Sequence, residues 1–96
     1  MAAYVIYHAE VTDPEQYERY REKVTRVVSD AGGEYVVRGG EIDQLEGERP
    51  LGRTVIVKFA SMDAARAFYY GETYREVKAI RSAAAITNAY IVDGVD

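Results

Sequence analysis

The 96-residue sequence contains no cysteine, no tryptophan, only two prolines and a single histidine, His8. Without cysteine the chain forms no disulfide and offers no thiolate to a metal ion, which fits a reducing cytoplasm. No apolar run approaches the length of about 18 residues that a membrane-spanning helix needs. The opening MAAYVIYHAE also lacks the basic region of a signal peptide. We therefore expect a cytoplasmic protein that has no membrane partner.

The chain also lacks an excess of basic residues and several familiar motifs. It has 12 Lys and Arg against 16 Asp and Glu, a net charge of −4, which argues against nucleic acid as a partner because phosphate binding needs a basic surface. We find no Gly-x-Ser-x-Gly nucleophile, no His/Asp metal cluster and no glycine-rich loop that opens a helix. The sequence thus predicts no metal site and no cofactor, and its lone histidine falls on an expected strand, which disfavours a haem ligand from a helix.

The periodicity of the apolar residues predicts both strands and helices. Alternating β-branched and aromatic residues indicate strands at residues 3–11, 34–38, 53–60 and 85–94. Helical spacing indicates one helix over residues 14–31 and a second that starts after Ser61 and is interrupted at Gly71. The order β-α-β-β-α-β predicts an α+β, ferredoxin-like sandwich, with both helices on one face of a four-stranded antiparallel sheet. We expect one domain over residues 1–96.

Local signals mark the helix ends and the loop between the middle strands. Asp13 suits an N-cap before Pro14, and Thr73 with Glu76 forms a capping-box pattern at the start of the last helical segment. The pair Gly39-Gly40 predicts a bulge or kink, after which EIDQLEGERPLG returns the chain as a ragged hairpin.

Alternation along the strands sorts their residues into two faces. The apolar set, which should lie under the helices, is Val5, Tyr7, Ala9, Val11, Tyr35, Val37, Val55, Val57 and Phe59. The mixed set is Tyr4, Ile6, His8, Glu10, Val36, Arg38, Thr54, Ile56, Lys58, Thr87 and Ala89. Asn88 and Tyr90 fall on the apolar side by this count, which makes the last strand the least regular. The mixed face is too apolar to remain bare, so we expect two copies to pack these faces around a small cavity as a homodimer.

Several segments resemble a known bacterial family. VTDPEQYERY, GGEYVVRGG, LEGERP, RTVIVKF and ETYREVKAIR, in this order, look like the family named domain of unknown function 1330, of the dimeric α+β barrel superfamily. The resemblance implies the ferredoxin-like fold and the dimer but no established activity. Other members of the superfamily include cofactor-independent monooxygenases, isomerases, haem-degrading enzymes and amino-acid-binding regulatory domains, and fold alone does not choose among them.

His8 and Arg38 are the main candidate site residues. His8 is the natural acid/base candidate near neutral pH, although a partly buried interface residue explains it as well. Arg38 is expected on the mixed face beside two glycines, where its guanidinium would hold an anion in a two-pronged geometry. The alternative for Arg38 is an ion pair with Glu34, Glu41 or Glu46.

The remaining candidates have structural explanations of equal merit. Tyr4, Thr54 and Lys58 would line the cavity from the mixed face, while a cross-strand pair with Glu10 is the alternative for Lys58. Tyr69, beside the break at Gly71, would form a pocket wall or pack in the core.

Two further arginines are placed near the rim. Arg81 would compensate the C-terminus of its helix or reach the cavity mouth as a ligand-binding residue. For Arg53 we favour a clamp on the loop through Glu46 and Glu48.

Three functions remain open at this point. The first is a homodimer that binds a small anionic or phenolic molecule, as a cofactor-free isomerase or oxygenase with His8 as base and Arg38 as anion holder. The second is a non-enzymatic or regulatory module whose mixed face is used up by dimerisation. The third is a subunit of a larger assembly.

Overall fold

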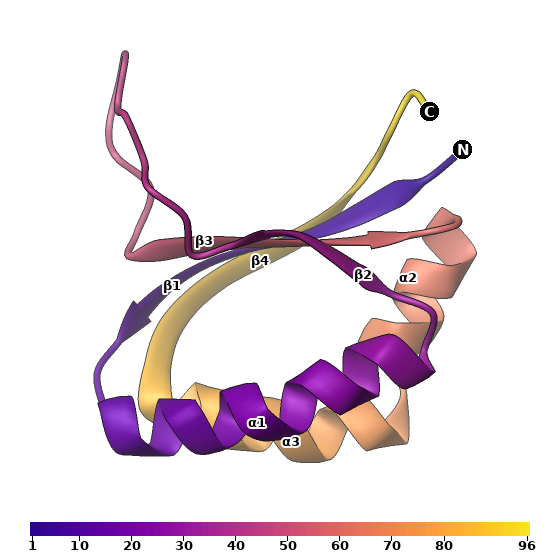
Figure 1. Ribbon diagram of the computed structural model, residues 1–96, viewed down its shortest axis with the longest axis horizontal. Helices are drawn as coiled ribbons and strands as arrows, with labels where there is room; N and C mark the ends of the chain where they lie inside the picture. Colours follow the sequence, from indigo (N-terminus) through magenta and orange to yellow (C-terminus); the bar gives the residue numbers. More distant parts are fainter.

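The computed structural model describes all 96 residues. Its elements, in chain order, are β1 (Ala3–Val11), α1 (Pro14–Asp30), β2 (Glu34–Arg38), β3 (Arg53–Phe59), α2 (Met62–Tyr69), α3 (Glu72–Ala84) and β4 (Ala85–Asp93). The strands form one antiparallel sheet in the order β2-β3-β1-β4, and all helices lie on one side of it (Figure 1). This confirms the α+β, ferredoxin-like fold. None of the helices combines the length and hydrophobicity needed to span a membrane.

Helix α1 begins and ends as the sequence predicts. The Asp13 side chain accepts a hydrogen bond from the Gln16 amide at 3.3 Å, and Pro14 occupies the first turn, where no amide hydrogen is needed. After the helix, Gly32 takes a left-handed conformation with φ +82°, which glycine adopts without strain. The helix buries an apolar stripe made by Tyr17, Tyr20, Val24 and Val28.

The second helical segment divides into α2 and α3 at Gly71. A Cβ on Gly71 would come within 2.8 Å of the Ala67 carbonyl oxygen, so the chain can turn tightly here only with glycine. Gly71 itself is the N-cap of α3 and supplies no side-chain hydrogen bond. The capping box predicted at Thr73 is therefore wrong, because Thr73 already lies inside the first turn.

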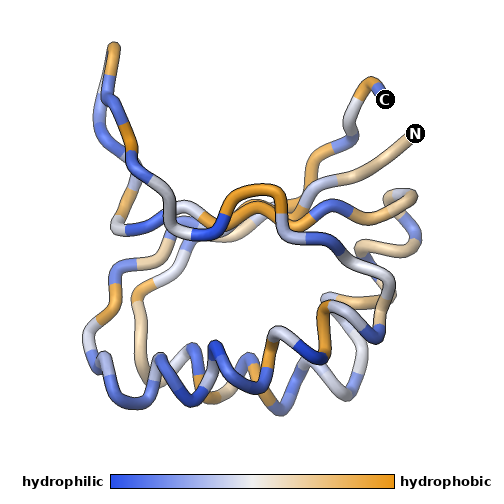
Figure 2. The backbone as a smooth tube through the Cα atoms, in the orientation of Figure 1, coloured by the Kyte–Doolittle hydropathy of each residue, from blue (hydrophilic) through white to orange (hydrophobic).

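The core fills the space between the sheet and the helices. Its largest fully buried side chains are Tyr74, Phe59, Val5 and Val57. The rings of Phe59, Phe68 and Tyr74 stack in series, with centroids 4.9 and 4.5 Å apart. Hydrophobic residues concentrate in the middle of the strands, whereas hydrophilic residues are frequent along the helices (Figure 2).

A bulge in β2 changes which way its last residues point. Tyr35 lies opposite Val57, but Val37 lies opposite Ile56 and Arg38 opposite Val55, so the register shifts by one residue between Tyr35 and Val37. Val37 therefore shares a face with Ile56, and Arg38 shares the helix side with Val55. The predicted faces of Val37 and Arg38 are wrong because the extra residue interrupts the strict alternation of side chains along the strand.

The predicted faces of β4 are also reversed. Asn88 pairs with His8 and Tyr90 with Ile6, so both lie on the side without helices, while Thr87 and Ala89 alternate to the other side. The strand follows α3 without an intervening loop, and its pairing with β1 sets the register. Nothing within the strand itself marks that register.

Residues 39–52 form no strand and join the adjacent antiparallel strands β2 and β3 as a long irregular connection, which confirms the predicted ragged hairpin. The segment rises from the sheet on the side opposite the helices, and the two chain ends rise at the other end of the sheet (Figure 1). Raised segments of the chain therefore flank the side of the sheet without helices at both of its ends.

Candidate functional site

We call the side of the sheet without helices the open face. The residues of β1, β3 and β4 whose side chains point toward this face include Tyr4, Ile6, His8, Thr54, Ile56, Lys58, Asn88, Tyr90 and Val92. His8 is half-buried at its centre, where Nδ1 lies 3.2 Å from Thr54 Oγ1 and the imidazole centroid lies 6.2 Å from that of Tyr90. The structure thus brings His8 and Thr54 together, as the sequence predicts, and adds Tyr90 and Asn88 to them.

Tyr4 and Lys58 lie at one end of the open face and share a partner. The Tyr4 hydroxyl donates to Asp96 Oδ2 at 2.9 Å, and Lys58 Nζ lies 3.1 Å from the same oxygen. These hydrogen bonds, that of Tyr4 first, hold the pKa of the Asp96 carboxyl below its usual value. Lys58 is therefore neutralised within the chain, although not by Glu10, which lies opposite Ile86.

Arg38 lies on the other side of the sheet from His8. Its Nη2 donates to Thr25 Oγ1 of α1 at 2.7 Å, and its guanidinium lies 4.2 Å from the ring centroid of Tyr35. It makes no ion pair with Glu34, Glu41 or Glu46. A single small ligand therefore cannot contact both His8 and Arg38, and the predicted joint arrangement of base and anion holder is wrong.

Arg53 and Arg81 also lie on the helix side. Arg53 makes no ion pair with Glu46 or Glu48, so the predicted clamp on the loop is wrong, and its guanidinium lies 5.5 Å from the Tyr17 ring centroid. Arg81 is only 5% exposed, and its Nη1 donates to the Tyr74 hydroxyl at 2.7 Å. It points into the protein and does not compensate the helix end at the surface.

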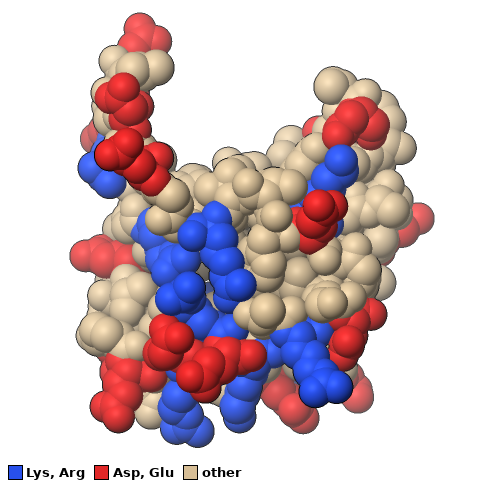
Figure 3. Space-filling view, viewed as in Figure 1, with Lys and Arg blue, Asp and Glu red and all other residues tan.

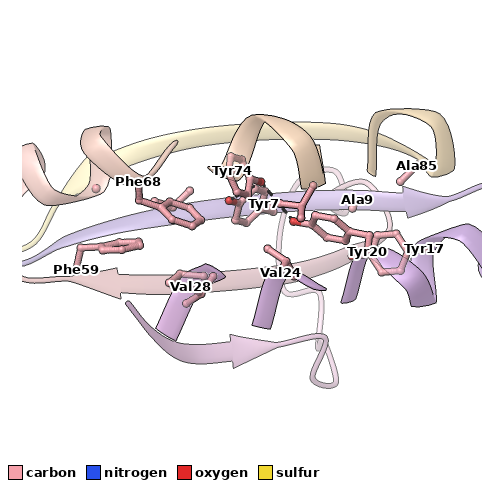
Figure 4. Packing of buried hydrophobic residues seen from close by; sticks show 14 of the residues in the cluster. Tyr7, Ala9, Tyr17, Tyr20, Val24, Val28, Phe59, Phe68, Tyr74 and Ala85 are labelled. Carbon is pink, nitrogen blue, oxygen red and sulfur yellow. Dashed lines mark hydrogen bonds between the residues drawn. The ribbon is translucent and has the colours of Figure 1, made fainter. Parts of the chain in front are cut away.

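Three tyrosine hydroxyls meet beside Arg81. The Tyr74 hydroxyl lies 2.9 Å from that of Tyr7 and 3.3 Å from that of Tyr20, so strand β1 and helices α1 and α3 each supply one ring (Figure 4). The sequence did carry a signal for this cluster. Tyr74, Val77, Arg81 and Ala84 recur at helical spacing and are all buried, which places Arg81 within the apolar stripe of α3.

A small cavity of about 20 Å³ lies between α1 and the sheet, and we call it the helix-side pocket. Its lining comprises Tyr7, Ala9, Tyr17, Tyr20, Arg21, Val24, Val28, Tyr35, Arg38, Arg53, Val55, Val57 and Arg81. The lining contains four arginines and no Asp or Glu. The mixed-face prediction missed this pocket because it assigned Arg38 to the wrong side.

Tyr69 belongs to a different place in the fold. It lines a shallow cavity of about 270 Å³ between α2 and the edge strand β4, together with Met62, Arg66, Tyr70 and Tyr90. Its ring also packs 5.1 Å from that of Tyr74, so it connects this cavity to the core.

The buried tyrosines predict a loss of stability at alkaline pH. Burial raises the pKa of Tyr7, Tyr20 and Tyr74 above the ordinary value of 10.0. Their contribution is present in full below that value and is lost as the pH rises from it toward the raised folded values, because only the unfolded chain then releases protons. We expect a loss of about 1.4 kcal/mol per pH unit for each tyrosine above pH ~10. The free energy of unfolding, measured with urea at each pH in this range, should fall less steeply with pH for Tyr20→Phe than for the wild type. An equal dependence on pH would contradict the prediction.

Comparison with known proteins identifies the family. The family model described as Domain of unknown function (DUF1330) matches residues 2–95. The chain belongs to this family. No curated protein matches it.

Solved structures show the same fold at low sequence identity. A protein of unknown function from Rhodopseudomonas palustris is 18% identical, with a TM-score of 0.78, over 99% of this chain and 83% of the other. SnoaB, a cofactor-independent oxygenase from Streptomyces nogalater, is 10% identical, with a TM-score of 0.73, over 99% and 94% of the two chains. A putative antibiotic biosynthesis monooxygenase from Bacteroides thetaiotaomicron is 14% identical, with a TM-score of 0.59, over 99% and 90%. This DUF1330 protein therefore shares the fold of these three proteins.

Proposed function

We propose that two copies of this DUF1330 protein pack their open faces together and enclose a small-molecule chamber around His8. The observation that carries the proposal is the character of the open face. Ile86, Tyr90 and Val92 are 57, 51 and 42% exposed on a side that no helix covers, around the half-buried pair of His8 and Thr54. An apolar face of this kind is typical of an interface, and a two-fold axis would cover both copies at once.

The chemistry of the open face favours a phenolic or other weakly acidic ligand. The charges of Lys58 and Asp96 neutralise each other at one end, and Arg38 lies on the opposite side of the sheet, so the residues paired directly with His8 are the neutral Thr54 and Asn88. An imidazole there can take a proton from a phenol, and Thr54 can orient the ring through Nδ1. The fold shared with SnoaB supports a cofactor-independent oxygenase or isomerase as the reaction class.

Light scattering tests the dimer. We expect a mass of twice 10.8 kDa for the wild type and of one chain for Tyr90→Lys, because the two lysines would be buried near one another in the paired sheets. Ala83→Lys, on the exposed surface of α3, is the matched control and should remain dimeric. A monomeric wild type, or a Tyr90→Lys variant of unchanged mass, would refute the pairing.

A thermal-shift screen of simple phenols tests the chamber. A phenol that stabilises the wild type should lose its effect in Tyr90→Lys, which lacks the chamber, and in His8→Gln, which lacks the base. A dimer that no phenol stabilises would favour the second candidate, a non-enzymatic or regulatory module whose open face serves only pairing. A mass above that of a dimer would indicate a larger assembly.

A further inference from the structure

The helix-side pocket holds more positive charge than the chain neutralises. Of its four arginines only Arg21 has a carboxylate partner, the exposed Glu18 at 3.3 Å, and the Nε atoms of Arg21, Arg53 and Arg81 are buried without any acceptor. Arg81, the most deeply buried, contacts only neutral hydroxyl and aromatic groups. Basic side chains gather at this side of the molecule, beneath the raised loop (Figure 3).

The tyrosine cluster adds one more unused donor. The three hydroxyls of Tyr7, Tyr20 and Tyr74 carry three hydrogens, but their two mutual contacts use only two of them. Tyr74 already accepts from Arg81, and a hydroxyl oxygen has two lone pairs, so Tyr74 must donate to one neighbour and accept from the other. The neighbour that accepts from Tyr74 keeps its own hydrogen free, and both Tyr7 and Tyr20 line the pocket.

The pocket thus has unused donors and no anionic group, because its only side-chain acceptors are neutral tyrosine hydroxyls. A neutral acceptor would satisfy the hydrogen bonds but leave the buried charge of Arg81 uncompensated, which is costly in a site that excludes water. The cavity of about 20 Å³ has room for one or two atoms of the size of a water oxygen, so only the oxygen end of a carboxylate would enter it, and a guanidinium can hold such a group bidentately. Val24, Val55 and Val57 offer apolar surface to the carbon atoms attached to such a group.

We propose that the helix-side pocket is a binding site for the carboxylate group of a small organic acid. Arg81 and the free hydroxyl of Tyr7 or Tyr20 bind the carboxylate at the deep end. The half-buried side chains of Arg21, Arg38 and Arg53 lie at the mouth, where the remainder of the acid is accommodated. This site is separated from the proposed chamber by the sheet itself, so it is independent of the pairing of open faces.

The thermal stability of Arg81→Met tests the proposal through two opposite effects. With butyrate or benzoate in excess, we expect a saturable rise in the Tm of the wild type, of roughly 10 °C at 100 times the Kd. Arg81→Met should show no rise and an affinity weaker by about 30-fold or more, because truncation removes the charge that holds the anion. Without ligand its Tm should equal or exceed that of the wild type, since a similar-sized apolar side chain removes an uncompensated buried charge.

Three comparisons make the result decisive. Arg75→Met, on the exposed surface of the same helix, should respond to carboxylates as the wild type does. Arg53→Met should weaken the response and serves if Arg81→Met does not fold. Sodium phosphate and sodium chloride at matched ionic strength should give no saturable rise.

Several results would overturn the proposal. These are the absence of a carboxylate response beyond that of chloride, an equal response to phosphate, an undiminished response in Arg81→Met and Arg53→Met, or a lowered Tm of unliganded Arg81→Met. The last would show that Arg81 serves the fold alone. Light scattering separates this site from the chamber, because Arg81→Met should keep the mass of the wild type.

Discussion

Replacing Phe59 by alanine should lower the free energy of unfolding by about 3–5 kcal/mol. The ring is 1% exposed, it packs 4.9 Å from that of Phe68, and a Cβ on Gly33 would lie 2.8 Å from its Cζ, so the neighbours cannot close the cavity without moving backbone. A domain of this size has about 5–15 kcal/mol of stability in total, so the variant would lose a large share of it.

Urea unfolding followed by far-UV circular dichroism measures this loss. The matched control is Tyr70→Ala, which removes an aromatic ring that is 74% exposed and should change stability by less than about 0.5 kcal/mol. A loss below about 1 kcal/mol for Phe59→Ala would mean that the sheet and α2 can repack around the missing ring.

Replacing Tyr74 by phenylalanine should cost about 1.5–3 kcal/mol, although it removes a single oxygen. That oxygen accepts a 2.7 Å hydrogen bond from buried Arg81 and also joins Tyr7 to Tyr20. Its loss leaves a buried guanidinium without this acceptor, which is more costly than the loss of a neutral pair. Equilibrium unfolding measures the change, and the proposed carboxylate should reduce it by offering Arg81 another acceptor.

The cost of Tyr74→Phe should depend on Arg81, which a double-mutant cycle can measure. In an Arg81→Met background the same change should cost less by about 1 kcal/mol or more, because no charge is then left without a partner. Tyr17→Phe is the control, since its hydroxyl makes no hydrogen bond within the chain. Equal costs in both backgrounds would show that the hydroxyl stabilises the core independently of Arg81.

Local features of the sequence predict the element order and most of the boundaries. The N-cap Asp13, the glycines after α1 and the alternation in β1 act over a few residues, so they can be recognised without tertiary context. The apolar side of β1 and β3 is confirmed on the same basis.

The composition of the site was less predictable because it depends on pairing between distant strands. The bulge in β2 exists only relative to β3, and it decides that Arg38 contacts Thr25 of α1 and not a ligand beside His8. The prediction for Arg81, a helix end or the cavity mouth, did not use its spacing from Tyr74 and Val77, which places it on the buried stripe.

The extra residue in β2 has a consequence for comparing homologues. Deleting Val36 would restore regular pairing with β3 and leave Arg38 opposite Val55 on the helix side, whereas keeping Val36 without the bulge would place Arg38 opposite Thr54 on the open face. The bulge therefore decides which of the two cavities receives the guanidinium of Arg38, while the backbone topology stays the same. Relatives of equal fold should be grouped by whether residue 36 is bulged or regularly paired before any ligand is transferred among them.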